Sequence, residues 1–172
     1  MLRKIILAAT ILIFYLLQTT LFRSVALASV SPNLFIILTV AAGFMRGKRE
    51  GLYVGFFCGL MLDLYYGQVI GFQALLYMYI GYINGFFHNL FYDDEITLPL
   101  GLVLGSDFIY NFVYYVFRFL LRNRLDFGYY FMHIILPEMI YTIVITIFIY
   151  RIMLRVNRAV EAYERKRATK FG

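Results

Sequence analysis

Six apolar segments alternate with short polar or glycine-containing breaks along the 172-residue chain. The segments cover residues 5–22, 32–45, 51–66, 71–91, 97–121 and 129–153. A membrane-spanning helix needs roughly 20 mainly apolar residues. The pattern therefore predicts a single all-α membrane domain over residues 1–172, a bundle of about six transmembrane helices. The second segment is short for a full span, and it is either a complete crossing or a re-entrant element.

A small residue or Asp63 recurs every fourth position through the third segment and the turn after it. Residues four apart share one ridge of a helix, and a ridge without side chains lets two membrane helices pack closely. The neighbour is either another helix of this chain or a helix of a partner. The candidate residues for helix packing or partner binding are Gly51, Gly55, Gly59, Asp63, Gly67, Gly71, Gly81 and Gly85.

The composition agrees with a membrane protein. Hydrophobic residues make up 62% of the chain and its mean hydropathy is +0.75, whereas soluble domains are roughly 45–50% apolar. The net charge is +6, and most of it lies after residue 150. Basic residues beside a membrane span indicate anionic lipid or an acidic protein as the partner, not nucleic acid.

Residues 154–172 are predicted to continue as a basic cytoplasmic tail helix. Its apolar residues, together with one before it, fall at helical spacing: Ile152, Val156, Ala159, Val160 and Tyr163. The tail either only anchors the orientation of the last span or binds lipid or a partner. Its candidate basic residues are Arg151, Arg155, Arg158, Arg165, Lys166 and Arg167.

The basic residues also predict topology. With six spans and a cytoplasmic N-terminus, twelve Lys and Arg residues lie on the cytoplasmic side and four outside. Because short cytoplasmic loops are enriched in these residues, both termini of a multi-pass membrane protein are expected in the cytoplasm.

Several polar side chains interrupt the predicted spans. A carboxylate at mid-membrane costs at least ~2.5–3.5 kcal/mol, so it must face protein, water or another polar group. For Asp63 we consider pairing with Arg118, hydrogen bonding near Gln73, or a place on a cavity or partner face. A hydrogen bond to the residue one turn later, or to tyrosines such as Tyr110, is favoured for Asp107. The intramembrane polar residues besides Asp63 are Gln73, Asp107, Asn111, Arg118 and Glu138.

No catalytic or cofactor motif appears in the sequence. Cys58 is the single cysteine, so an internal disulfide or a cysteine-rich metal site is excluded. Four-ligand metal spacing and a glycine-rich phosphate loop are both missing from the sequence. We therefore expect no cofactor and no enzymatic activity, and an intramembrane enzyme using Asp63, Asp107 or Glu138 ranks third among the functions considered.

The part of the chain from Pro32 to Phe86 resembles the MreD family of rod shape-determining membrane proteins. The resemblance rests on Pro32-Asn33-Leu34, the Arg46–Gly51 loop, a glycine-spaced helix ending in Leu60-x-x-Asp63, and Gly67-x-x-x-Gly71-x-x-Ala74-Leu75 followed by Gly81-Tyr82. The last two predicted spans carry no motif that matches the family.

This resemblance implies a non-enzymatic scaffold of the bacterial cell-elongation machinery that regulates peptidoglycan synthesis. Its partners would be the bitopic protein MreC, the actin-like MreB, the glycosyltransferase RodA and a class B penicillin-binding protein. The family fold resembles the substrate-binding subunits of energy-coupling-factor transporters, which supplies the alternative function of binding a vitamin-type small molecule. The short outer loops, poor in polar groups, favour the scaffold, and we expect the hairpin of the third and fourth spans to contact a partner helix.

Overall fold

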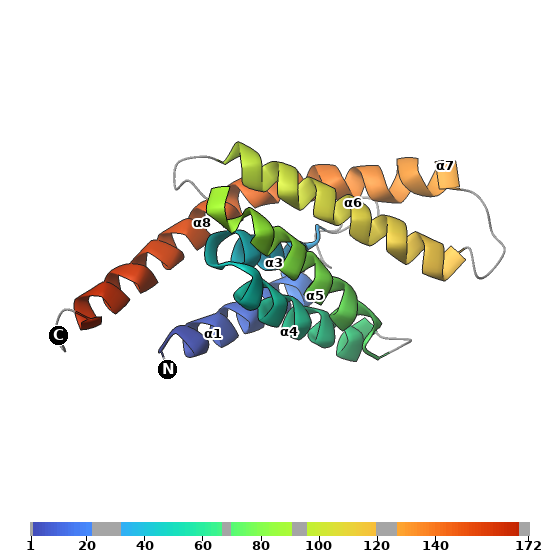
Figure 1. Cartoon of the computed structure of the whole chain (residues 1–172). Coiled ribbons are helices and arrows are strands. Elements are labelled where there is room, and N and C mark those ends of the chain that lie inside the picture. The colour runs from blue at the N-terminus through green and yellow to red at the C-terminus, as the bar shows by residue number, and fades with distance from the viewer. Residues whose placement is uncertain (1, 22–31, 67–69, 91–95, 120–126, 169–172) are drawn as a thin grey trace.

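The described part of the chain is entirely helical in the computed structural model (Figure 1). The structure describes residues 2–21, 32–66, 70–90, 96–119 and 127–168. The predicted all-α class is confirmed for these residues. The number of helices that cross the membrane stays a prediction.

Each predicted apolar segment coincides with a helix or a run of joined helices. In chain order the elements are α1 (Leu2–Leu16), the π-helix η1 (Leu17–Leu21), α3 (Leu34–Arg46), α4 (Lys48–Tyr66), α5 (Phe72–Asn84), the 3-10 helix η2 (Gly85–Leu90), α6 (Thr97–Phe119), α7 (Phe127–Tyr130), the π-helix η4 (Phe131–Ile135) and α8 (Leu136–Ala168). The predicted tail helix is the C-terminal part of α8 and not a separate element.

Two helical runs are long and apolar enough to cross a membrane. They are Thr97–Phe117 in α6 and Gly128–Tyr163, which runs through α7, η4 and α8. Only 28% and 17% of their most apolar stretches are buried inside the protein. Lipid is the natural solvent for such large apolar surfaces, so both runs fit a membrane protein.

The glycines of α4 bring its backbone into direct contact with the backbone of α5. A Cβ atom added at Gly51, Gly55 or Gly59 would lie 2.3, 2.2 or 2.4 Å from the backbone oxygen of Gly81, Tyr77 or Gln73, respectively. Real Cβ atoms do not approach so closely, so no larger residue fits these positions without moving a helix. The contact is reciprocal, because a Cβ at Gly81 would lie 2.0 Å from the oxygen of Gly51. The neighbour of the predicted glycine ridge is therefore a helix of the same chain (Figure 1).

Helix α3 forms the centre of the core. Every residue from Leu34 to Met45 is buried, as expected for a helix that is apolar on all sides. One side of α3 packs on the α4–α5 hairpin, where a Cβ at Gly43 would lie 2.6 Å from the oxygen of Gly81. Residues of α6 and α8, including Val103, Ile145 and Ile149, complete the same core.

The α4–α5 contact predicts opposite effects for one substitution at two glycines. Gly55→Ala should lower the free energy of unfolding by ~1–3 kcal/mol or more, because the new methyl group meets backbone atoms. Gly101→Ala on α6, where no described atom lies within 4 Å of the new methyl group, should be neutral or gain up to ~1 kcal/mol in helix propensity. The thermal unfolding midpoint of each purified variant in detergent measures the difference, and equal midpoints would contradict the contact.

Candidate functional site

Asp63 joins the two helices of the hairpin at the end of α4. Its carboxylate accepts hydrogen bonds from the backbone N–H groups of Gly71 (2.9 Å), Gln73 (3.1 Å) and Ala74 (3.0 Å). The first N–H groups of a helix have no partner within that helix, and its N-terminus favours negative charge. Asp63 therefore caps α5 from the neighbouring helix, where α5 has no side-chain cap of its own.

This geometry corresponds to one of the arrangements considered for Asp63, hydrogen bonding near Gln73. The side chain of Arg118 lies outside the described residues, so an ion pair with it stays a prediction. Gly71 differs from the packed glycines, because nothing described lies within 4 Å of an added Cβ. Its φ of +97° is a left-handed conformation that glycine adopts readily. Gly67 lies outside the described residues.

Asn33 connects three helices and was missed by the sequence reasoning. As N-cap of α3, its side-chain oxygen accepts a bond from the Ile36 N–H (3.3 Å) and another from the Tyr77 hydroxyl of α5 (2.8 Å). Its own N–H donates to the hydroxyl oxygen of Thr142 on α8 (3.2 Å). Asparagine is one of the strongest N-cap residues, and this preference was the available signal.

The beginning of α3 is also bound by a side chain of η1. The predicted segment 32–45 starts two residues before α3, which begins at Leu34. Gln18 of η1 binds this entry through both ends of its amide: it accepts from the Leu34 N–H (2.8 Å) and donates to the Pro32 carbonyl (3.0 Å). A glutamine in an otherwise apolar segment was the only sequence signal for this contact.

Two of the predicted polar residues, Gln73 and Asp107, are both neighbours of Tyr110 on α6. The Tyr110 hydroxyl of α6 donates to the side-chain oxygen of Gln73 (3.3 Å). The buried Asp107 carboxylate accepts a bond from the Asn111 amide one helical turn later (3.4 Å), as favoured from the sequence.

Glu138 of α8 belongs to the same polar group as Asp107 of α6. Its electrostatic neighbours include Asp107 and Asn111, so α6 and α8 present these three side chains to one another. Among the described residues, the hydrogen-bond partners of Asp63 are backbone N–H groups of the hairpin. Within the described ranges no group of three or more His, Cys, Asp or Glu residues could hold a metal ion. The polar contacts described above join one helix to another. Such contacts fix the relative positions of membrane helices.

Comparison with known families agrees with the sequence motifs. The family model described as rod shape-determining protein MreD matches residues 1–160. This chain belongs to the MreD family. The resemblance is confirmed, and the match extends over α6 and most of α8, where no motif was visible. No curated protein and no solved structure gives a significant match, so the expected likeness to energy-coupling-factor subunits stays a prediction.

The MreD-family match identifies a rod shape-determining membrane protein. Its predicted basic tail is represented by Arg151, Arg155 and Arg158, whose side chains are exposed on α8. The side chains of Arg165, Lys166 and Arg167 lie outside the described residues.

The capping geometry predicts that Asp63→Asn destabilises this MreD-family protein. An amide has one accepting oxygen, and its NH₂ group would face at least one of the three backbone donors, so we expect a loss of ~1–3 kcal/mol in unfolding free energy. Glu161→Gln is the matched control, because this exposed side chain accepts a hydrogen bond from Asn157 and a glutamine keeps an accepting oxygen for it. Chemical denaturation in detergent gives both values. If Asp63→Asn were as stable as the unmodified protein, Asp63 would not be the cap.

Proposed function

We propose that this protein is a non-enzymatic, multi-pass scaffold subunit of the bacterial cell-elongation complex. In this role it binds an MreC-type bitopic protein in the cytoplasmic membrane and helps regulate lateral peptidoglycan synthesis. MreB-type filaments, RodA-type glycosyltransferase and a class B penicillin-binding protein are the further partners. The family match over residues 1–160 carries the proposal. The beginning of α1 and the end of α8 lie on the same side of the molecule (Figure 1), which supports the predicted cytoplasmic placement of both termini.

The glycines of the hairpin pack against other helices of this protein. We therefore place the binding site for the partner helix, the partner seat, on α6. Gly51, Gly55 and Gly59 contact the backbone of α5 and leave no groove for another helix. Gly101 and Gly105 have the same four-residue spacing, yet no described atom lies within 4 Å of an added Cβ at either position.

The face around these two glycines is both hollow and apolar. An open hollow of about 360 Å³ is lined by Thr97, Leu98, Gly101 and Leu102. Farther along the same face the exposed side chains of Phe108 and Phe112 follow. Ridges of small residues are a common contact between membrane helices. The single membrane helix of an MreC-type partner would pack on this face, over roughly 20 Å of helix length.

A double substitution on α6 tests this seat. Gly101→Leu with Gly105→Leu should leave folding intact, because the new side chains point into open space. It should remove most of the MreC-type protein that copurifies from native membranes and convert rod-shaped cells to round ones.

The matched control enlarges an exposed residue on the hairpin instead. Leu75→Phe, at a side chain that is 51% exposed, should keep the partner and the rod shape. Retention of the partner by the glycine double variant would refute the α6 seat. Loss caused by Leu75→Phe alone would return the seat to the hairpin, as first expected from the sequence.

A further inference from the structure

The C-terminal half of α8 is fastened to the protein along one face. Tyr150, Leu154, Asn157 and Val160 are buried, and these positions fall on one side of a helix. The apolar face expected from the sequence was largely a different one, because Ile152 and Val156 are 59% and 40% exposed. The rotation of α8 is therefore fixed by contacts that its own periodicity does not reveal.

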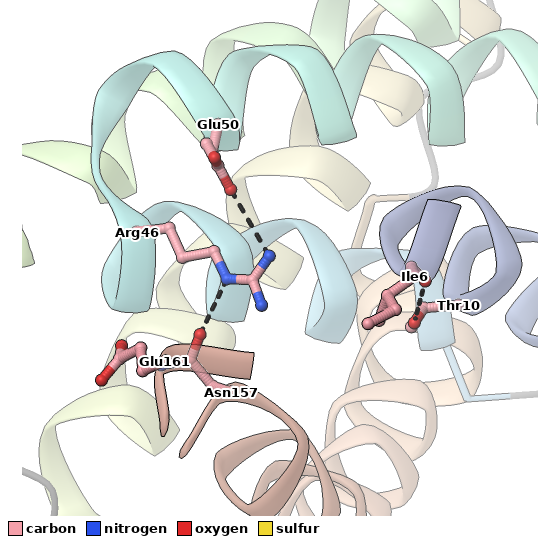
Figure 2. Close-up of polar contacts among 6 residues, drawn as sticks. All are labelled: Ile6, Thr10, Arg46, Glu50, Asn157 and Glu161. Carbon is pink, nitrogen blue, oxygen red and sulfur yellow. Dashed lines mark hydrogen bonds and ion pairs between the residues drawn. The ribbon is translucent and has the colours of Figure 1, made fainter. Parts of the chain in front are cut away.

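A polar cluster fixes this rotation at the junction of α3 and α4 (Figure 2). The Arg46 Nε donates to the side-chain oxygen of Asn157 (2.8 Å), and the same guanidinium lies 3.5 Å from the Glu50 carboxylate. The Asn157 amide then donates to Glu161 (2.8 Å). In the proposed topology the basic residues between the second and third spans, which begin with Arg46, lie at the cytoplasmic membrane boundary. Asn157, which binds Arg46, then lies at the same level.

Arg151 and Arg155 stand just on the membrane side of this level. At ~1.5 Å per residue they precede Asn157 along α8 by roughly 9 and 3 Å. Arg155 is thus within the headgroup region, which is about 5–7 Å deep, and the long side chain of Arg151 can extend to it. Both side chains are exposed, and neither has a hydrogen bond or ion pair with the described residues. Each is followed directly by an exposed apolar residue, Ile152 or Val156.

We propose that this face of α8, made of Arg151, Ile152, Arg155 and Val156, binds the headgroups of anionic phospholipids in the cytoplasmic leaflet. The two guanidinium groups, one turn apart, bind lipid phosphate oxygens, for which arginine is well suited. Ile152 and Val156 contact the upper acyl chains. Positive charge next to apolar surface, at a membrane boundary, is complementary to an anionic lipid and not to a soluble acidic protein. The proposal rests on the cytoplasmic C-terminus of the proposed topology but does not depend on MreC binding.

Lipid retention by the purified full-length chain tests the proposal without any protein partner. The probe is a mixture of phosphatidylglycerol and phosphatidylcholine in detergent micelles, with bound lipid counted by native mass spectrometry. The unmodified protein should retain phosphatidylglycerol preferentially. Arg151→Gln with Arg155→Gln should reduce that preference by about tenfold or more. Each arginine strengthens binding to an anionic surface, and the two losses of affinity multiply.

The matched control removes two other exposed cytoplasmic charges. Lys48→Gln with Arg49→Gln lowers the net charge equally and should keep most of the preference. Equal loss in both double variants, or no preference for phosphatidylglycerol in the unmodified protein, would overturn the site. The second of these results would leave the face to an acidic protein.

A charge-preserving variant covers the case in which the glutamine variant fails to fold. Arg151→Lys with Arg155→Lys should still prefer phosphatidylglycerol, but more weakly, because lysine cannot make the paired hydrogen bonds of a guanidinium. Bound phosphatidylglycerol should fall as salt is raised from 0.15 to about 1 M, where screening is strong. Retention that does not change with salt would contradict a phosphate–arginine site. The result is independent of the α6 partner seat, so either proposal can fail alone.

Discussion

Direct contact between the backbones of α4 and α5 is the constraint on which the rest of the structure depends. Without side chains at Gly51, Gly55 and Gly59, the carbonyl groups of α5 reach the surface of α4. Because α4 and α5 lie so close together, α3 contacts both of them through Gly43. This contact places α3 in the centre of the core. α6 and α8 then close the other side of the same core, and their outward surfaces stay apolar.

The hydrogen bonds around this core fix the relative positions of the helices and add little to the free energy of unfolding. Hydrogen bonds between membrane helices contribute only ~0.6–2 kcal/mol each, whereas close packing extends along the whole hairpin. Asn33 nevertheless fixes where α3 begins relative to α5 and α8, because its partners Tyr77 and Thr142 belong to those helices. Asp63 does the same for the start of α5. Polar residues in this protein specify position, and apolar contact supplies the attraction.

The sequence predicted local features well and distant pairings poorly. Helix positions follow from apolar run length, and the Asp107–Asn111 bond follows from one helical turn. Spacing could not reveal which glycine ridge is filled, because Gly101 and Gly105 repeat the pattern of α4 yet stay open. The sequence also did not reveal which face of α8 packs on the protein. Asn157 is a polar residue on that face, and it is buried where it binds Arg46, 111 residues away in the chain. Such contacts depend on the folded arrangement and leave no periodic signal.

The glycines of α4 hold two helices of the chain together, and the open glycines of α6 are the proposed binding site for a partner helix. The most direct measurement of the first is a carbon–carbon dipolar coupling between labelled Gly55 Cα and the Tyr77 carbonyl, recorded by solid-state NMR in lipid bilayers. The account predicts a detectable coupling, as expected for two backbones in van der Waals contact. No detectable coupling in folded protein would show that α4 and α5 are held apart and would contradict the central claim.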